Sequence, residues 1–138
     1  MQRVTFRGDN GKYLKASWVN GQRRLEFSSD SRNGEEMAFE RTSNTLEGES
    51  CLIKSVHFGK YLRTIPSNLP VIADVDHPAP YDIATMFKVE KLGGQHVALR
   101  NISNKNYCRR STEGEYKNFL CADATTVVDQ AKLLMEEV

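Results

Sequence analysis

The chain has 138 residues, with 19 basic and 18 acidic side chains and a formal net charge of +1. This length predicts a single domain, residues 1–138, that is large enough to bury a hydrophobic core. The balanced charge, without a basic tract, excludes nucleic-acid binding through a basic surface. Because the sequence has no long apolar run and no N-terminal signal pattern, we expect no membrane insertion and a cytoplasmic or nucleocytoplasmic location.

One pattern of residues occurs three times along the chain. The three copies read VTFRGDNGKYLK (4–15), CLIKSVHFGKYLR (51–63) and VALRNISNKNYCR (97–109). Each begins with alternating apolar residues and a base, continues through a polar loop, and ends in Tyr, an apolar residue and a second base. Alternation with a period of two predicts two strands, each buried on one face, joined by a short turn.

The first polar loop contains Arg7-Gly8-Asp9, a tripeptide that serves some extracellular proteins as an integrin-binding signal. The corresponding positions in the other copies are Lys54-Ser55-Val56 and Arg100-Asn101-Ile102, which are not adhesion motifs. The following Asn-Gly tolerates the positive φ of a tight turn. We therefore interpret the tripeptide as the start of a hairpin turn, because short motifs recur by chance.

Each copy continues into two further apolar segments. The third segments are LEFSSD (25–30), VIADVD (71–76) and LCADAT (120–125), and the fourth are MAFE (37–40), FKVE (87–90) and LLME (133–136). Three repeats, at approximately 4–50, 51–96 and 97–138, thus carry four short strands each. This pattern predicts an all-β fold, a β-trefoil with six barrel strands and three hairpins, because three propeller blades would not close.

The repeat register makes two specific structural predictions. Leu14, Leu62 and Cys108 occupy equivalent positions and should all be buried. In the C-terminal segment TTVVDQAKLLMEEV (125–138), apolar spacing alone could indicate a helix. Alignment with the other repeats instead predicts a short helical turn at 129–131, followed by the last strand.

The three cysteines, Cys51, Cys108 and Cys121, are an odd number, and the first two occupy apolar positions of the repeat. We interpret them as small buried hydrophobic residues in a reducing compartment. A disulfide between Cys108 and Cys121 is the alternative, because a hairpin would bring them close. The glycosylation sequon Asn101-Ile-Ser103 is expected to be unused without a secretory route.

Known catalytic and metal-binding patterns are missing from the sequence. The histidines, His57, His77 and His96, lie in three separate loops without metal-ligand spacing. Nucleophile elbows and phosphate-binding loops are also absent. We therefore expect a protein that is not an enzyme and that uses no cofactor or metal, although a fold by itself excludes neither.

The G-K-Y-L segments at 11–14 and 59–62, the third repeat over 97–123 and the closing LLMEE together resemble the agglutinin domain of amaranthin-like plant lectins. The resemblance covers the whole chain in one domain copy. It implies a β-trefoil that binds glycans, with the Galβ1-3GalNAc disaccharide (T-antigen) bound between paired domains. The Gln-x-Trp repeats of ricin-type trefoils are missing, so three ricin-type sites are not implied.

A sugar site needs an aromatic ring for the apolar face of a pyranose and planar polar groups for its hydroxyls. Trp18, beside the Asn-Gly turn of 16–22, is the stacking candidate, unless it caps the barrel. The resemblance assigns sugar contacts to the loop after the second G-K-Y-L, where Asn68 is either a ligand contact or a turn former. His77 and Tyr81 form a third candidate loop, with a solvated connector as the alternative.

The sequence therefore predicts a carbohydrate-binding lectin for galactose- or N-acetylgalactosamine-containing glycans. Because the chain carries one domain copy, we expect a homodimer with shallow sites lined by both chains. The alternative is a trefoil scaffold or interaction module with a degenerate sugar site. Leu69-Pro70-Val71 favours that alternative, since the family typically has aromatic residues there.

Overall fold

The computed structural model describes residues 1–43, 49–66 and 69–138, and these form a sheet of twelve strands. The first repeat contains β1 (Gln2–Arg7), β2 (Tyr13–Val19), β3 (Gln22–Ser29) and β4 (Phe39–Ser43). The second contains β5 (Ser50–Ser55), β6 (Lys60–Ile65), β7 (Leu69–Val75) and β8 (Met86–Gly93). The third contains β9 (His96–Asn101), β10 (Tyr107–Arg110), β11 (Leu120–Ala124) and β12 (Leu133–Glu137). Four strands per repeat are therefore confirmed.

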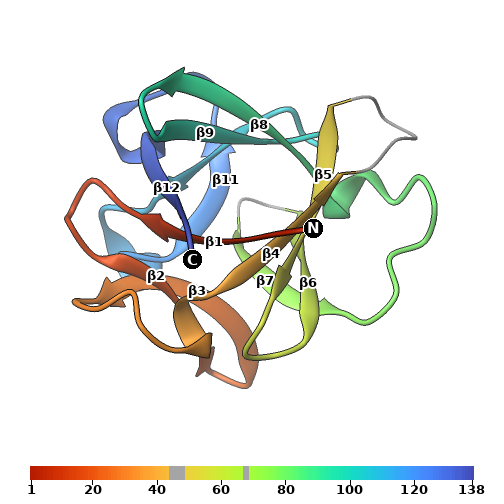
Figure 1. Ribbon diagram of the computed structural model, residues 1–138, viewed down its shortest axis with the longest axis horizontal. Helices are drawn as coiled ribbons and strands as arrows, with labels where there is room; N and C mark the ends of the chain where they lie inside the picture. Colours follow the sequence, from red (N-terminus) through yellow and green to blue (C-terminus); the bar gives the residue numbers. More distant parts are fainter. Residues whose placement is uncertain (44–48, 67–68) are drawn as a thin grey trace.

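Six of the strands close into a barrel. Antiparallel pairing runs from β1 to β4, β5, β8, β9 and β12, and β12 pairs back with β1. The other six strands form the hairpins β2–β3, β6–β7 and β10–β11, which touch one another through β3–β7 and β7–β11 pairs. Figure 1 looks roughly along the axis that the three repeats surround. The predicted β-trefoil is therefore confirmed.

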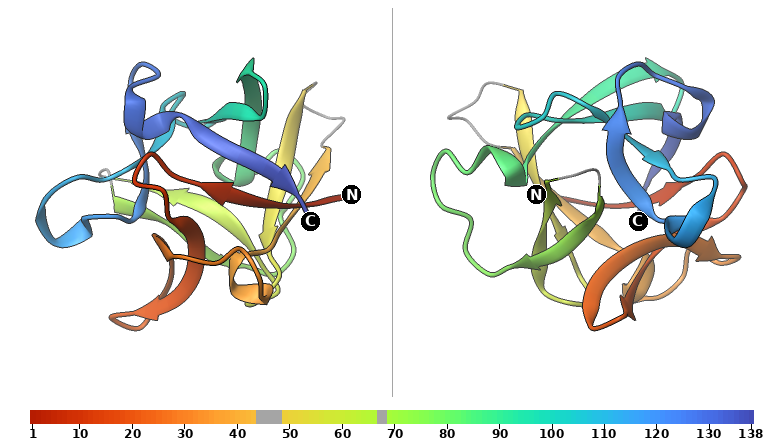
Figure 2. Two further views of the ribbon diagram at one scale, coloured as in Figure 1. Left: turned by 60° about the vertical axis from the view of Figure 1, so that its left-hand side comes forward. Right: turned by 180° about the vertical axis from the view of Figure 1, so that it is seen from behind.

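The two chain ends lie side by side on the barrel (Figures 1 and 2). The backbone N–H of Val138 donates to the carbonyl oxygen of Arg3 at 3.0 Å. Strands β1 and β12 thereby join the first repeat to the third and close the ring.

The recurring base and tyrosine form one structural unit in each repeat. The base of the first strand lies over the ring of the tyrosine that opens the second strand, in the pairs Arg7–Tyr13 (5.5 Å), Lys54–Tyr61 (5.6 Å) and Arg100–Tyr107 (5.4 Å). These strand partners face each other in register, so the cation–π contact accompanies the pairing of the two strands. Tyr107 also donates to Glu90 at 2.9 Å, and this hydrogen bond raises the pKa of the tyrosine.

The core is built from the symmetry-related positions that the register predicted. Leu14, Leu62 and Cys108 are buried, with exposed fractions of 0, 1 and 0%. They pack in one cluster with four phenylalanines, Phe6, Phe27, Phe39 and Phe87. The equivalence of the three positions is therefore confirmed.

The Arg-Gly-Asp tripeptide begins at the last residue of β1 and leads into the turn between β1 and β2, as predicted. Arg110 of the third repeat holds Asp9 by two hydrogen bonds, at 2.7 and 3.0 Å, and Arg7 donates to the carbonyl of Gly11 at 2.9 Å. A Cβ at Gly8 would approach the Phe27 ring to 2.8 Å, so this position requires glycine. Both charged side chains of the tripeptide are thus held by contacts within the molecule.

The C-terminal segment follows the repeat register rather than the helical spacing. A short 3₁₀ turn covers Asp129–Ala131, and β12 follows it. Ala131 and Leu133 are fully buried, which fixes the turn and the strand against the barrel.

The three cysteines are free and buried, so the alternative of a Cys108–Cys121 disulfide is wrong for this structure. Burial raises the pKa of the Cys121 thiol to about 12, which keeps the thiol protonated. Asn101 of the sequon is fully buried, and its amide donates to the backbone carbonyls of Ala84 and Met86. Its side chain is therefore occupied by structural hydrogen bonds.

Candidate functional site

Trp18 lies near the end of β2, in the hairpin that β2 forms with β3. The hairpin turns through Asn20 and Gly21, whose φ angles of 49° and 75° are those of a two-residue type I′ turn. The Trp18 side chain is 58% exposed. The indole therefore faces solvent at a rigid hairpin end and does not cap the barrel.

Two neighbouring side chains contact the exposed indole, and a third contacts one of these two. Arg23 faces Trp18 across the hairpin, with its guanidinium carbon 4.5 Å from the centre of the indole. Phe58, from the turn between β5 and β6, meets the indole edge to face at 5.8 Å. His57 contacts Phe58 in turn, at 4.9 Å between ring centres. We refer to Trp18, Arg23, His57 and Phe58 as the Trp18 cluster.

A hollow of about 220 Å³ opens beside this cluster, between the first and second hairpins. Trp18, Gly21, Gln22 and Arg23 line it from the first hairpin, and Arg63, Ile65, Ile72 and Asp74 line it from the second. We call this site the Trp18 hollow. Arg63 donates to both carboxylate oxygens of Asp74, at 2.8 and 3.0 Å, and these hydrogen bonds raise the pKa of Arg63.

An exposed indole beside a guanidinium–carboxylate pair occurs once among the described hairpins. The Arg63–Asp74 pair has a counterpart in Arg109–Asp123, at 2.7 and 3.1 Å. The position of Trp18, five residues after the repeat tyrosine, is occupied by Pro66 in the second repeat and Thr112 in the third. The first and second hairpins therefore bring together an exposed indole and a guanidinium–carboxylate pair.

The predicted site residues do not all converge on this hollow. His77 is exposed and follows Asp76, whose pKa is lowered first by Lys60 and also by the charges of His77 and Arg23. His77 therefore lies within electrostatic range of Asp76, as does Arg23. Tyr81 is 64% exposed, in the loop that follows β7, and is not part of the hollow. Asn68 lies outside the described residues.

The expected loop after the second G-K-Y-L is shorter than the sequence suggested. Leu69 and Pro70 already belong to β7, and Pro70 is buried and pairs with Cys121 of the third hairpin. The expectation that this loop includes Leu69 and Pro70 is therefore wrong. Proline fits here because the pairing between β7 and β11 involves this single register position.

Sequence reasoning missed the residues that complete the site with Trp18. Arg63 and Asp74 recur as Arg109 and Asp123 on the facing strands of the next hairpin, so the repeat alignment carried a signal for the pair. Arg23 and Phe58 had no such signal, because their contact with Trp18 joins two different repeats.

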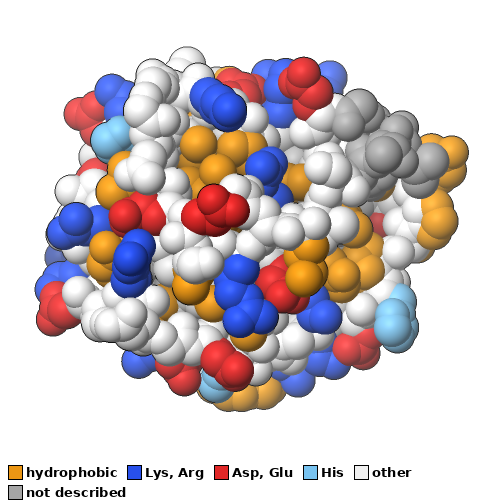
Figure 3. Space-filling model, viewed as in Figure 1, with side chains coloured by type: hydrophobic (Ala, Val, Ile, Leu, Met, Phe, Trp, Pro, Cys, Tyr) orange, Lys and Arg blue, Asp and Glu red, His pale blue; other side chains and the backbone are white. Residues whose placement is uncertain are grey.

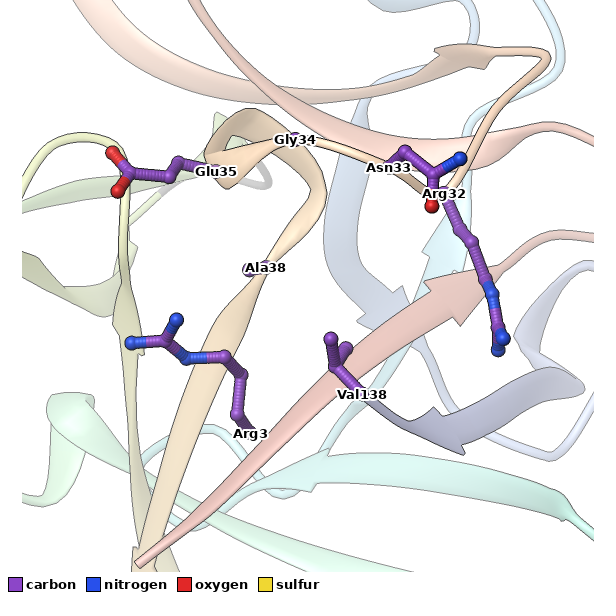
Figure 4. A pocket seen from close by; sticks show the side chains of 7 residues that line it. All are labelled: Arg3, Arg32, Asn33, Gly34, Glu35, Ala38 and Val138. Atoms are coloured by element: carbon purple, nitrogen blue, oxygen red, sulfur yellow. The ribbon is translucent and has the colours of Figure 1, made fainter.

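Other hollows on the molecule have a different chemical character. One of about 350 Å³ is lined by Arg3, Arg32, Asn33, Gly34, Glu35, Ala38 and Val138. Figure 4 shows Arg3 and Glu35 on one side of it and Arg32 on the other, with Val138 between them. Its two guanidinium groups already pair with Glu40, at 3.1 Å, and with Glu136, at 3.5 Å. Without a tryptophan, tyrosine or phenylalanine ring, this hollow offers no platform for a sugar.

Two further hollows, of about 400 and 460 Å³, share His96 and Lys132, and neither is lined by an aromatic ring of Trp, Tyr or Phe. The face of the molecule in Figure 3 carries interspersed acidic and basic side chains rather than a basic tract. Over residues 1–43, 49–66 and 69–138, no cluster of three or more His, Cys, Asp or Glu could hold a metal ion. Within the same ranges, no helix has the length and apolar character needed to cross a membrane.

Comparison with solved structures supports the fold. The match to ThreeFoil, a designed three-fold symmetric protein, has a TM-score of 0.77 at 10% sequence identity, and the aligned region covers 99% of each chain. The match to the BEL β-trefoil has a TM-score of 0.77 at 17% sequence identity and covers 99% of this chain and 93% of the other. The match to SeviL, solved with an asialo-GM1 saccharide, has a TM-score of 0.72 at 12% sequence identity and covers 100% of this chain and 98% of the other.

The search of curated proteins gave no match. The sequence model of the Agglutinin domain, by contrast, matches residues 1–138 in full. This match agrees with the resemblance carried by the repeated G-K-Y-L segments and with the β-trefoil described above. The chain belongs to the agglutinin-domain family.

Proposed function

We propose that the protein is a carbohydrate-binding lectin and that the Trp18 hollow is its sugar site. The observation that carries this proposal is the exposed indole at the edge of a hollow that also contains the Arg63–Asp74 pair. Membership of the agglutinin-domain family supports it. Binding without catalysis is the proposed activity.

The hollow supplies the two kinds of contact that a pyranose needs. The indole face of Trp18 offers an apolar surface for the C–H face of the sugar ring. Asp74 can accept hydrogen bonds from sugar hydroxyls, while Gln22 and the guanidinium groups can donate. The type I′ turn and the contacts of Arg23 and Phe58 position the indole before the ligand arrives, which lowers the entropy cost of binding.

We propose galactose- or N-acetylgalactosamine-containing glycans, such as the T-antigen disaccharide Galβ1-3GalNAc, as the ligands. The axial hydroxyl of galactose leaves one face of the ring apolar, which suits stacking on a single exposed indole. The saccharide bound by SeviL, a protein of the same fold, is consistent with this class.

We further propose that two chains pair and that the partner completes the site. A single shallow sugar contact is weak, and multivalent binding can add about two to four powers of ten in avidity. Tyr81, 64% exposed, and Ile83, 41% exposed, are two exposed apolar residues between β7 and β8 that suit contact with a second chain. Asn68 and His77 belong to the same proposed interface. Dilution below the dimer dissociation constant should then weaken glycan binding.

A glycan array followed by calorimetry tests the sugar-binding function. The wild-type protein should bind galactose-type glycans, Trp18→Ala should abolish binding, and Trp18→Phe should retain part of it. Leu92→Ala is the matched control, because it truncates an exposed apolar side chain, 41% exposed, that does not line the Trp18 hollow.

Flat signals on the array at high protein concentration would remove the lectin function. That outcome would favour the alternative, a trefoil scaffold or interaction module with a degenerate sugar site. A protein that sediments as a monomer and keeps its full glycan affinity would refute a site shared between two chains. A site within one chain would still stand.

A further inference from the structure

Arg23 differs from every other arginine of the chain in its hydrogen bonding. The sequence contains ten arginines, all within the described ranges. Nine of them donate at least one side-chain hydrogen bond: Arg3, Arg7, Arg24, Arg32, Arg41, Arg63, Arg100, Arg109 and Arg110. Among the described residues, the Arg23 guanidinium has neither a hydrogen bond nor an ion pair. Its five N–H donors are therefore available to a ligand.

The position of Arg23 gives these free donors a function. Its guanidinium lies over the Trp18 ring, at 4.5 Å, and lines the Trp18 hollow. A cation–π contact uses the face of the guanidinium, so it leaves the in-plane N–H groups free to donate. The same stacking restricts the side chain, which reduces the entropy lost when a ligand pairs with it.

The other charges around the hollow are compensated within the protein. Arg63 pairs with Asp74 and is also influenced by Asp82, and Asp76 pairs with Lys60. Arg23 is within electrostatic range of Asp76 but makes no hydrogen bond or ion pair with any described residue, so among these residues it is the cation of the hollow that is left for a ligand. A guanidinium matches the two oxygens of a carboxylate or a sulfate in fork geometry, and such charge-assisted bonds are about twice as strong as neutral ones.

We propose that the Trp18 hollow prefers an acidic glycan, in which Arg23 pairs with a carboxylate or sulfate ester while Trp18 stacks on the adjoining sugar ring. This inference rests on the proposed lectin function and specifies the ligand class of the same site. It makes Arg23 a specificity-determining residue, because the indole alone does not distinguish acidic from neutral sugars.

Calorimetry with three probes tests the preference: neutral Galβ1-3GalNAc, its sialylated form and its sulfated form. At least one acidic probe should bind about ten-fold more tightly than the neutral parent, since a charge-assisted pair replaces a neutral contact. The gain should shrink as salt is raised from 0.05 to about 0.5 M, where charges are screened over shorter distances. Comparison of the two acidic probes separates carboxylate from sulfate recognition.

Variants separate recognition by Arg23 from support of the indole. Arg23→Gln should remove the acidic preference, so that the acidic and neutral probes bind this variant within about two-fold of each other, and Arg23→Lys should keep part of the preference. Lys91→Gln, which removes one exposed positive charge on β8 outside the hollow, is the matched control and should change neither. Circular dichroism checks that each variant is folded.

Three outcomes would overturn the inference. Equal affinity of the wild-type protein for all three probes would leave the lectin function standing without the acidic preference. An equal loss of all probes in Arg23→Gln would show that Arg23 only supports Trp18. Failure of every probe to bind the wild-type protein would refute the sugar site itself and the inference with it.

Discussion

Truncation of Leu62 to alanine tests the three-fold equivalence on which the structure rests. Leu62 is 1% exposed and packs in the cluster that contains its equivalents, Leu14 and Cys108. The substitution removes three buried carbons, each contributing about 0.8 kcal/mol of transfer free energy. Because the surrounding strands relax only partly, a cavity adds to this loss, and the total should be about 2–5 kcal/mol.

This loss is large against a domain stability of about 5–15 kcal/mol, so it should be easy to measure. Urea titration followed by circular dichroism should show the midpoint falling by about 1–3 M, given typical urea slopes for a domain of this size. Leu14→Ala should behave like Leu62→Ala. Cys108→Ala should cost about 1 kcal/mol, because the cysteine side chain is smaller.

The exposed Leu92 provides the control for the side-chain change alone. Leu92→Ala should alter the free energy of unfolding by less than about 0.5 kcal/mol. A loss below about 0.5 kcal/mol in Leu62→Ala as well would show that the repeat register and the burial of Leu62 are wrong.

Asn101→Ala should cost about 2–4 kcal/mol in a urea titration, because it removes the side-chain donor to the Ala84 carbonyl and the side-chain acceptor of the Ser103 N–H; an unchanged midpoint would contradict that role. Asp9→Asn should cost about 1 kcal/mol through the partly buried pair with Arg110, and a double-mutant cycle without coupling would show that the pair contributes nothing. The Cys121 thiol, whose folded pKa of about 12 exceeds its ordinary value of 9.0, stabilises the fold fully below pH 9.0, and this stability is lost as the pH rises toward 12. Cys121→Ala should lessen that decline, and an identical pH profile for both proteins would contradict the assignment.

The sequence by itself determined the architecture, because the same local pattern of strands and turns occurs in each repeat. Alternating apolar residues define which face of each strand is buried. The paired base and tyrosine mark the turn between the first and second strands of each repeat. The same register predicted the turn at 129–131 against the helical spacing of the C-terminal segment. Agreement between the three copies compensated for weak signals in any single one.

The tertiary structure alone decided how the repeats contact one another, and the candidate site lies where the first and second repeats come together. Arg110 and Asp9 are 101 residues apart, and Trp18 and Phe58 belong to different repeats, so no local pattern could have paired them. Leu69 and Pro70 are strand residues rather than loop residues because Leu69 pairs with Ile65 of β6 and Pro70 pairs with Cys121 of β11. Arg23 stands out because its nine counterparts all find hydrogen-bond acceptors within the described chain. Periodicity specifies the face on which a side chain lies, whereas its partners depend on the packing of hairpins that are distant in sequence.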